Sequence, residues 1–143
     1  MRALVYGPPP TMGNKVACVT RDGRAFVRER NDNGLRSWQG AMREAMLADQ
    51  PPEMPQDGIA VAVTVVVARP KGHFGKRGLL PSARRAPTVK PDACKIQRAL
   101  YDCLSGIWCP DDSHVIQVQF AKRYQTPGDP LDQPRVEVWA LAL

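Results

Sequence analysis

Residues 59–68 form an almost uninterrupted apolar run with five valines and one isoleucine, broken only by Thr64. The run is about half as long as a membrane-spanning helix, and its β-branched side chains favour extended backbone over helix. We therefore expect an interior strand that is buried on both faces. Such a strand needs neighbours, so the rest of the chain must supply a sheet and the elements that cover it.

Shorter β-prone segments lie on both sides of this run. Two of them are separated by residues 21–24, which contain an Asp-Gly pair. This pair is typical of a tight hairpin turn, because glycine adopts the positive φ that such a turn requires. The segments that we expect to be extended are 3–6, 15–20, 25–28, 114–124 and 135–143.

Two amphipathic helices are expected from apolar residues that recur every three or four positions. The first starts near Asn33-Gly34 and ends before Pro51, and the second starts at Asp92 and ends at Ser105-Gly106. The buried stripes are Leu35, Trp38, Met42, Ala45 and Met46 in the first helix and Ile96, Ala99, Leu100, Cys103 and Leu104 in the second.

The resulting order, β-ββ-α-β-α-β-β, predicts a single small α+β domain over residues 1–143, with a mixed sheet and two main helices. Three consecutive prolines at 8–10 end the first apolar segment, so we expect no secretory leader, no membrane span and a cytoplasmic location. The four cysteines have no Cys-x-x-Cys spacing and only two histidines accompany them, which argues against a zinc site or a disulfide framework.

The net charge of +6 is concentrated in one segment. Residues 69–90 contain seven basic residues and no acidic one, and the rest of the chain is close to neutral. Prolines and glycines throughout 69–91 exclude long regular structure, so this is a basic loop. It either binds a polyanion such as DNA or is a solvated loop without a partner. Its basic residues are Arg69, Lys71, Lys76, Arg77, Arg84, Arg85 and Lys90.

Acidic residues follow this loop and occupy the turn before a later strand, namely Asp92, Asp111 and Asp112. Carboxylates beside a cationic segment suggest a Mg²⁺ site, because this hard cation prefers oxygen ligands and assists phosphodiester hydrolysis. The simpler interpretation is that Asp92 only caps a helix and that the other two only shape a turn. The sequence has no recognisable nucleophile motif and no Walker-type phosphate loop.

Segment 90–106, Lys-Pro-Asp-Ala-Cys-Lys-Ile-Gln-Arg-Ala-Leu-Tyr-Asp-Cys-Leu-Ser-Gly, resembles the central signature of RusA-type Holliday junction resolvases. Residues 107–115 are similar to that family's second motif, in which an aromatic residue and a short turn precede an Asp-Asp pair. The basic loop resembles that of actinobacterial and phage members, and Gly7-Pro8-Pro9-Pro10 through Asn14-Lys15 resembles the family's opening. The likeness covers nearly the whole chain.

This resemblance implies a homodimer that binds branched DNA and cuts opposing strands of a four-way junction with Mg²⁺, for which Mn²⁺ can substitute. It implies that Asp92 and Asp112 bind the metal, with Asp111 as a further candidate. Arg98 falls on the family's catalytic lysine and Lys95 on an asparagine position, so both are candidate catalytic residues. An arginine cannot give up a proton, so Arg98 can act only by binding and stabilising the negative charge of the phosphate. The 69–91 loop and the hairpin from Lys15 to Arg28 are expected to hold the DNA backbone.

Cys94 departs from the family pattern, which has an aspartate at this position. A thiol is a poor ligand for Mg²⁺, and the change also removes a charge that would hold the metal. Asp111 or Asp102 could compensate, but Asp102 lies more than two helical turns further along the chain. We therefore expect impaired or absent magnesium-dependent cleavage.

The sequence alone is compatible with two functions: an active junction-selective endonuclease and a catalytically inactive protein that binds branched DNA. A basic RNA-binding protein ranks third, because it requires stacking aromatics on an exposed sheet and most of the nine aromatic residues are expected to be buried. If the active-site assignment is right, Asp92 and Asp112 should lie within about 6 Å of each other, close enough to share one ion.

Overall fold

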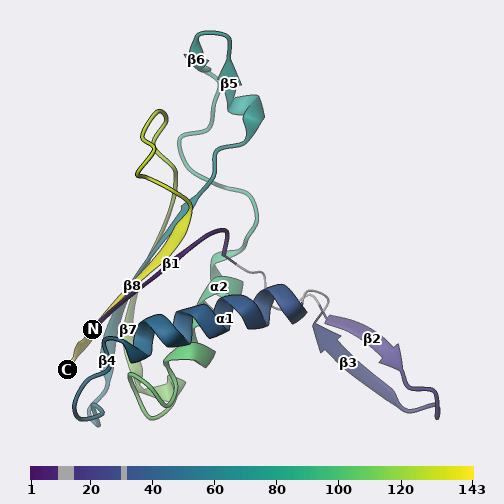
Figure 1. Cartoon of the computed structure of the whole chain (residues 1–143), viewed down its shortest axis with the longest axis vertical. Coiled ribbons are helices and arrows are strands. Elements are labelled where there is room, and N and C mark those ends of the chain that lie inside the picture. The colour runs from purple at the N-terminus through teal and green to yellow at the C-terminus, as the bar shows by residue number, and fades with distance from the viewer. Residues whose placement is uncertain (10–14, 30–31) are drawn as a thin grey trace.

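The computed structural model describes residues 1–9, 15–29 and 32–143. A four-stranded sheet and two helices form the body of the domain, and two hairpins project from it (Figure 1). The predicted α+β fold, the two main helices and their order are confirmed, and the short strands β5 and β6 are additional. The elements are β1 (Arg2–Tyr6), β2 (Lys15–Val19), β3 (Ala25–Glu29), α1 (Asp32–Leu47), β4 (Ile59–Val67), β5 (Phe74–Gly75), β6 (Gly78–Leu79), α2 (Ala93–Leu104), β7 (Val115–Tyr124) and β8 (Arg135–Ala142).

The sheet has the strand order β1-β8-β4-β7. β4 runs antiparallel to β8 and parallel to β7, and β1 pairs antiparallel with the other edge of β8. A parallel pair requires a long crossover connection, and the connection from β4 to β7 contains both the basic loop and α2. The topology therefore places the start of α2 at the end of the basic loop.

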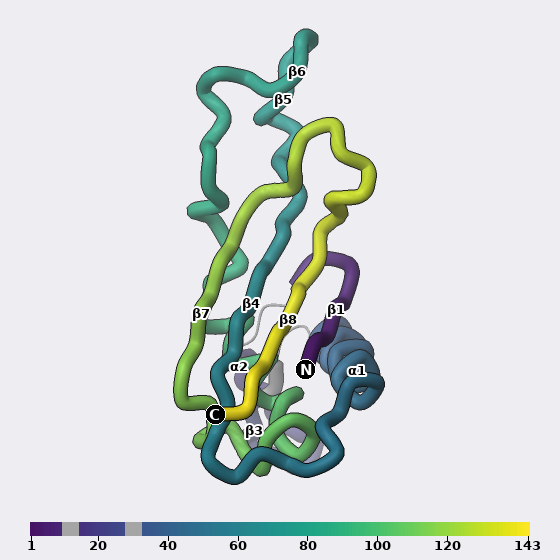
Figure 2. Tube along the Cα trace, turned by 90° about the vertical axis from the view of Figure 1, so that its left-hand side faces the viewer, coloured from purple at the N-terminus to yellow at the C-terminus, as the bar shows by residue number. Residues whose placement is uncertain are grey.

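Both helices pack against one face of the sheet (Figures 1 and 2). The predicted stripes are confirmed, since the α2 residues are all buried and Ala45 in α1 is partly buried. The buried residues of α1 are Leu35, Trp38, Met42 and Met46.

No helix in the described part of the chain is long and apolar enough to cross a membrane.

β4 is an interior strand, but the prediction that both of its faces are buried is wrong. The side chains that face the helices are buried, whereas Ala60, Ala62 and Thr64 on the other face are only partly covered. The two helices occupy one side of the sheet, so the side that Figure 2 turns toward the viewer lacks a covering layer in the described ranges. We call this surface the open face; pairing across the strands gives it Ala60, Ala62, Gln117, Gln119, Trp139 and Leu141.

Residues 68–91 leave the end of β4 as an arm that returns to the start of α2 (Figure 1). As predicted, the arm has no long regular structure; it contains a 3-10 turn at Lys71–His73 and the two-residue strands β5 and β6. Its base is fixed to β7, where the Arg69 guanidinium lies 4.7 Å from the centre of the Tyr124 ring. The arm therefore starts from a defined position on the sheet.

The hairpin predicted around residues 21–24 is also confirmed. β2 and β3 pair antiparallel, and Gly23 in the turn has φ of 84°, a conformation that favours glycine. Lys15 is exposed at the start of β2. Asn14 and Pro10, part of the predicted family opening, lie outside the described residues.

Candidate functional site

One side of α2 faces away from the core and carries residues that the sequence singled out. Cys94, Gln97, Arg98 and Tyr101 are three or four positions apart, so they share one side of the helix. Cys94 is exposed and its thiol is free. This side of α2 is therefore available to a ligand.

A tightly packed turn after α2 brings Asp112 to the same side. Gly106 adopts φ of 78°, and the following Trp108 is fully buried. The indole Nε1 of Trp108 donates a hydrogen bond of 2.9 Å to the carbonyl oxygen of Met46, which ties the turn to α1. Asp112 then begins the 3-10 turn that leads directly into β7.

Cys94, Gln97, Arg98, Tyr101 and Asp112 line one hollow of about 240 Å³, which we call the α2 hollow. Burial and the nearby Asp112 carboxylate raise the pKa of Tyr101, so the negative charge of Asp112 acts on this side of the helix. The structure thus brings together positions 94, 98 and 112, which the sequence connected only through two separate motifs.

Asp92 precedes α2, but its side chain does not cap the helix. Its carbonyl oxygen accepts from the backbone N–H groups of Lys95 and Ile96, each at 3.2 Å. The carboxylate makes no capping hydrogen bond and lies 3.7 Å from the Lys95 ammonium. The carboxylate is therefore not used as a helix cap, contrary to the simpler interpretation. Asp92 is not among the residues that line the α2 hollow, and its approach to Asp112 stays a prediction.

The two aspartates of the Asp-Asp pair differ in their contacts. Asp111 accepts hydrogen bonds from the hydroxyl and the backbone N–H of Ser113 and lies 3.3 Å from Nδ1 of His114. The Ser113 bonds, followed by His114, lower the pKa of Asp111, so this carboxylate shapes the turn. The Asp112 carboxylate makes no hydrogen bond or ion pair with any residue that the structure describes. Asp112 is therefore the better candidate ligand of the two.

The donor atoms around α2 do not complete a site for a hard cation. Within residues 1–9, 15–29 and 32–143, no three His, Cys, Asp or Glu side chains lie close enough together to hold a metal ion. The α2 hollow offers one carboxylate and the thiol of Cys94, and sulfur suits softer metals than Mg²⁺. The residues present therefore do not fit tight magnesium binding.

The basic residues of the arm fall into two groups. Arg69 donates to the carbonyl oxygen of Arg84 at 3.1 Å, and Arg84 donates to the Thr88 hydroxyl at 2.8 Å, so these two arginines fold the arm. The other five are exposed, and their side chains form no hydrogen bond or ion pair with the residues that the structure describes. They are Lys71, Lys76, Arg77, Arg85 and Lys90.

The sequence interpretation missed three polar residues near the site. Gln97 and Tyr101 share the helical spacing of Cys94 and Arg98, so that spacing could have identified them. Lys122 pairs in register with the buried Val65. It therefore occupies an inward-facing position, where a lysine is unusual. Its ammonium donates to the carbonyl oxygens of Val89 and Pro91 at 2.8 and 3.0 Å, which fixes the chain just before Asp92.

The family model described as Endodeoxyribonuclease RusA matches residues 7–138. This match contains the arm, the whole of α2 and the turn that carries Asp112. No curated protein matches the chain closely enough to serve as a further comparison. Because the match spans nearly the full length and both motifs, the chain belongs to the RusA endodeoxyribonuclease family.

Proposed function

We propose that this chain is a homodimeric, junction-selective DNA-binding protein whose metal-dependent cleavage is weakened by Cys94. RusA family nucleases are metal-dependent and resolve Holliday junctions. The observation that carries the proposal is the α2 hollow, in which a thiol lies beside Asp112 and Arg98 where the family pattern has a carboxylate. A catalytically inactive junction-binding protein is the second candidate, and the same thiol favours it.

Each site residue has a separate role in this proposal. Arg98 holds a DNA phosphate at the hollow through its permanent charge and paired N–H donors. Asp92 and Asp112 are the remaining carboxylates of the family's metal site, for which Mg²⁺ is the expected ion. Lys95 balances the charge of Asp92, to which it lies close. The exposed arm cations and Lys15 hold the backbone of branched DNA on either side.

Salt dependence tests whether the arm binds DNA. If its five exposed cations each contact a phosphate, the logarithm of the association constant should fall with the logarithm of salt concentration at a slope of about −4.5 per subunit. Replacing both Lys76 and Arg77 by alanine should flatten the slope by about 2. Arg43→Ala is the control, because Arg43 instead donates to the carbonyl oxygen of Asp102 on the helix side. An unchanged slope in the double variant means that the arm is only a solvated loop.

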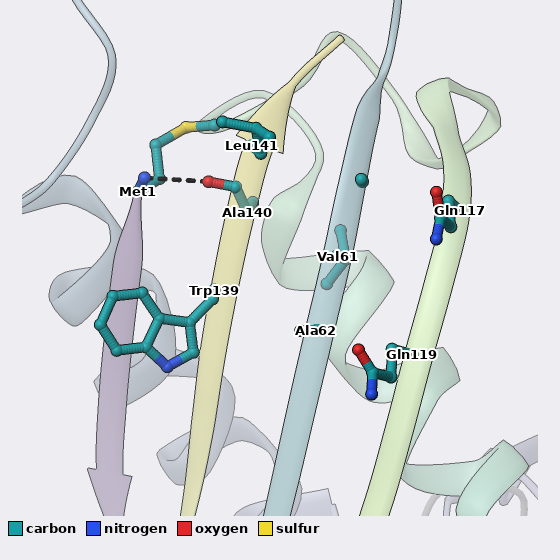
Figure 3. Close-up of a pocket in the computed structure, with 9 residues that line it drawn as sticks. Met1, Val61, Ala62, Gln117, Gln119, Trp139, Ala140 and Leu141 are labelled. Atoms are coloured by element: carbon teal, nitrogen blue, oxygen red, sulfur yellow. Dashed lines mark hydrogen bonds between the residues drawn. The ribbon is translucent and has the colours of Figure 1, made fainter.

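The open face is the dimer interface that we propose. It contains a hollow of about 410 Å³ lined by Met1 and by residues of β4, β7 and β8 (Figure 3). Trp139 and Leu141 are 49% and 70% exposed there. A two-fold interface brings the same surface of two copies together, and the side chains that line the hollow are uncharged. Two cations lie beside them: the Met1 ammonium donates to the carbonyl oxygen of Ala140 at 2.9 Å, and the Arg2 guanidinium lies 4.6 Å from the centre of the Trp139 ring. A dimer also matches the two-fold symmetry of a four-way junction.

We expect Trp139→Glu to convert the dimer into a monomer at tens of micromolar, because each copy would lose a large apolar ring from the interface and would bury a carboxylate in its place. Sedimentation velocity measures this directly. Leu47→Glu is the matched control, since Leu47 is 55% exposed on α1, on the opposite side of the sheet. If Leu47→Glu dissociates the dimer and Trp139→Glu does not, the interface lies on the helix side.

A further inference from the structure

Phe74 lines a small hollow between the arm and the loop that joins β7 to β8. The hollow has a volume of about 140 Å³ and is also lined by Arg69, Gln125 and residues 126–128 of that loop. Phe74 is 42% exposed, so its ring is open to a ligand. We call this hollow the Phe74 slot.

Both sides of the slot are held in place. On the arm side, the backbone N–H of His73 donates to Pro70 at 2.9 Å and that of Leu80 donates to His73 at 2.9 Å. On the loop side, the backbone N–H and hydroxyl of Thr126 donate to the carboxylate of Asp132 at 2.8 and 2.7 Å. The slot is therefore built from parts that are fixed before any ligand binds.

The chemistry of the slot suits a flat, polar-edged ring. Phe74 on one side and Pro127 on the other provide apolar surface. The side-chain amide of Gln125, which has no hydrogen-bond partner among the described residues, offers both a donor and an acceptor. A nucleobase has this combination of an apolar face and a hydrogen-bonding edge, and aromatic side chains are common stacking partners for bases.

The charged residues near the slot also favour a nucleic acid as the ligand. Lys76 and Arg77 occupy the turn between β5 and β6, directly beyond Phe74, and the arm contains no acidic residue. Arg69 also lines the slot, and the Asp132 carboxylate on the loop side is paired with Arg123 and Arg135. An apolar ring with cations nearby fits a nucleic acid, in which anionic phosphates flank each base.

We propose that the Phe74 slot holds an unstacked base of branched DNA and that this contact contributes to selection of junctions over linear duplex. The inference rests on the proposed function and deepens it. Taking a base out of continuous duplex costs a few kcal/mol of stacking and pairing, and the cost is least where pairing or stacking is already interrupted. Binding in the slot is therefore most favourable for bases at a branch point.

The test measures binding of the full-length protein, without divalent metal, to a four-way junction and to a linear duplex of equal length. We expect Phe74→Ala to weaken junction binding about tenfold and duplex binding less than about twofold, with the salt slope unchanged. Gln125→Ala should weaken junction binding by a smaller factor, and Phe74→Trp should retain it. Leu47→Ala, an exposed apolar truncation on α1, is the control. The fluorescence of a 2-aminopurine placed at the branch point should increase when the natural protein binds and should not increase when Phe74→Ala binds.

The outcomes separate the slot from the proposed function. Equal loss on both DNAs, or no loss on either, overturns the slot but leaves junction binding intact. If the natural protein binds the junction no better than the duplex, the proposed function itself fails. A lower melting temperature of Phe74→Ala accompanied by loss of all binding also counts against the slot, because it assigns the ring a structural role.

Discussion

Cys94→Asp is expected to increase magnesium-dependent cleavage of a four-way junction by at least about 100-fold, with little change in DNA affinity. Changing residues that merely support a metal ligand alters activity or metal affinity by about 10- to 100-fold, and this substitution restores a ligand itself. Position 94 is exposed in the first turn of α2, where an anion is favoured by the helix dipole. It also lies one turn from Arg98, with which an aspartate pairs favourably.

Binding gives a second measurement for this substitution. An added carboxylate near Asp112 repels it until a cation is bound, so Mg²⁺ should raise the melting temperature of Cys94→Asp more than that of the natural protein. The controls are Cys94→Ser, which cannot restore the charge, and Asp92→Asn in the Cys94→Asp background, which should abolish cleavage. If the natural protein already cuts as fast as Cys94→Asp, position 94 is not a metal-ligand position and the alignment of the central motif is wrong.

Asp132→Asn is expected to lower the free energy of unfolding by about 3 kcal/mol at pH 7. The Asp132 side chain is 7% exposed and accepts paired hydrogen bonds from Arg123 at 2.6 and 2.8 Å, with Arg135 adding a third at 2.7 Å. The substitution leaves the two guanidinium groups without their shared anion. The value lies at the lower end of the range for broken buried pairs, because Arg123 itself is 44% exposed. Urea unfolding measures the difference.

The contribution of Asp132 to the stability of the fold should depend on pH. Arg123, followed by Thr126 and Arg135, lowers the pKa of Asp132 far below its usual range. A group with a lowered native pKa stabilises the fold above its unfolded pKa of about 4, and this contribution is lost as the pH falls toward the native value. The stability difference between the natural protein and Asp132→Asn should therefore be constant from pH 5 to 7 and narrow below about pH 4. Asp22→Asn, which breaks an exposed pair with Arg24, should change stability little at any pH.

The sequence predicted the elements of the body because each is encoded locally. The apolar stripes of α1 and α2 and the valine run of β4 need no distant partner to be recognised. The coverage of β4 could not be predicted this way, because a valine run suits burial on one face or two. The outcome depends on where both helices pack and on what covers Ala60 and Ala62. β5 and β6 are too short to produce a pattern and depend on contacts within the arm.

The sequence predicted those residues of the candidate site that lie close together in the chain, and it missed those that lie far apart. Cys94 and Arg98 lie on one helix and Asp112 follows within one short turn, so two adjacent motifs contain all three. The different contacts of Asp111 and Asp112 depend on the fold of a turn that no spacing rule describes. Phe74 and Gln125 come from segments that are far apart in the chain, and neither has a motif of its own. Only the pairing of β4 with β7 brings them to the same end of the sheet.

The position of β8 has a consequence for how the protein is made. β8 is translated after all the other described strands, yet it lies inside the sheet between β1 and β4. Until it emerges from the ribosome, β1 has no partner strand, and β4 exposes a valine-rich edge that can pair with other chains. The apolar stripes of α1 and α2 then have only part of a sheet to pack against. The nascent chain should therefore bind chaperones until residues 135–142 have left the ribosome, and only then can the four-stranded sheet be completed.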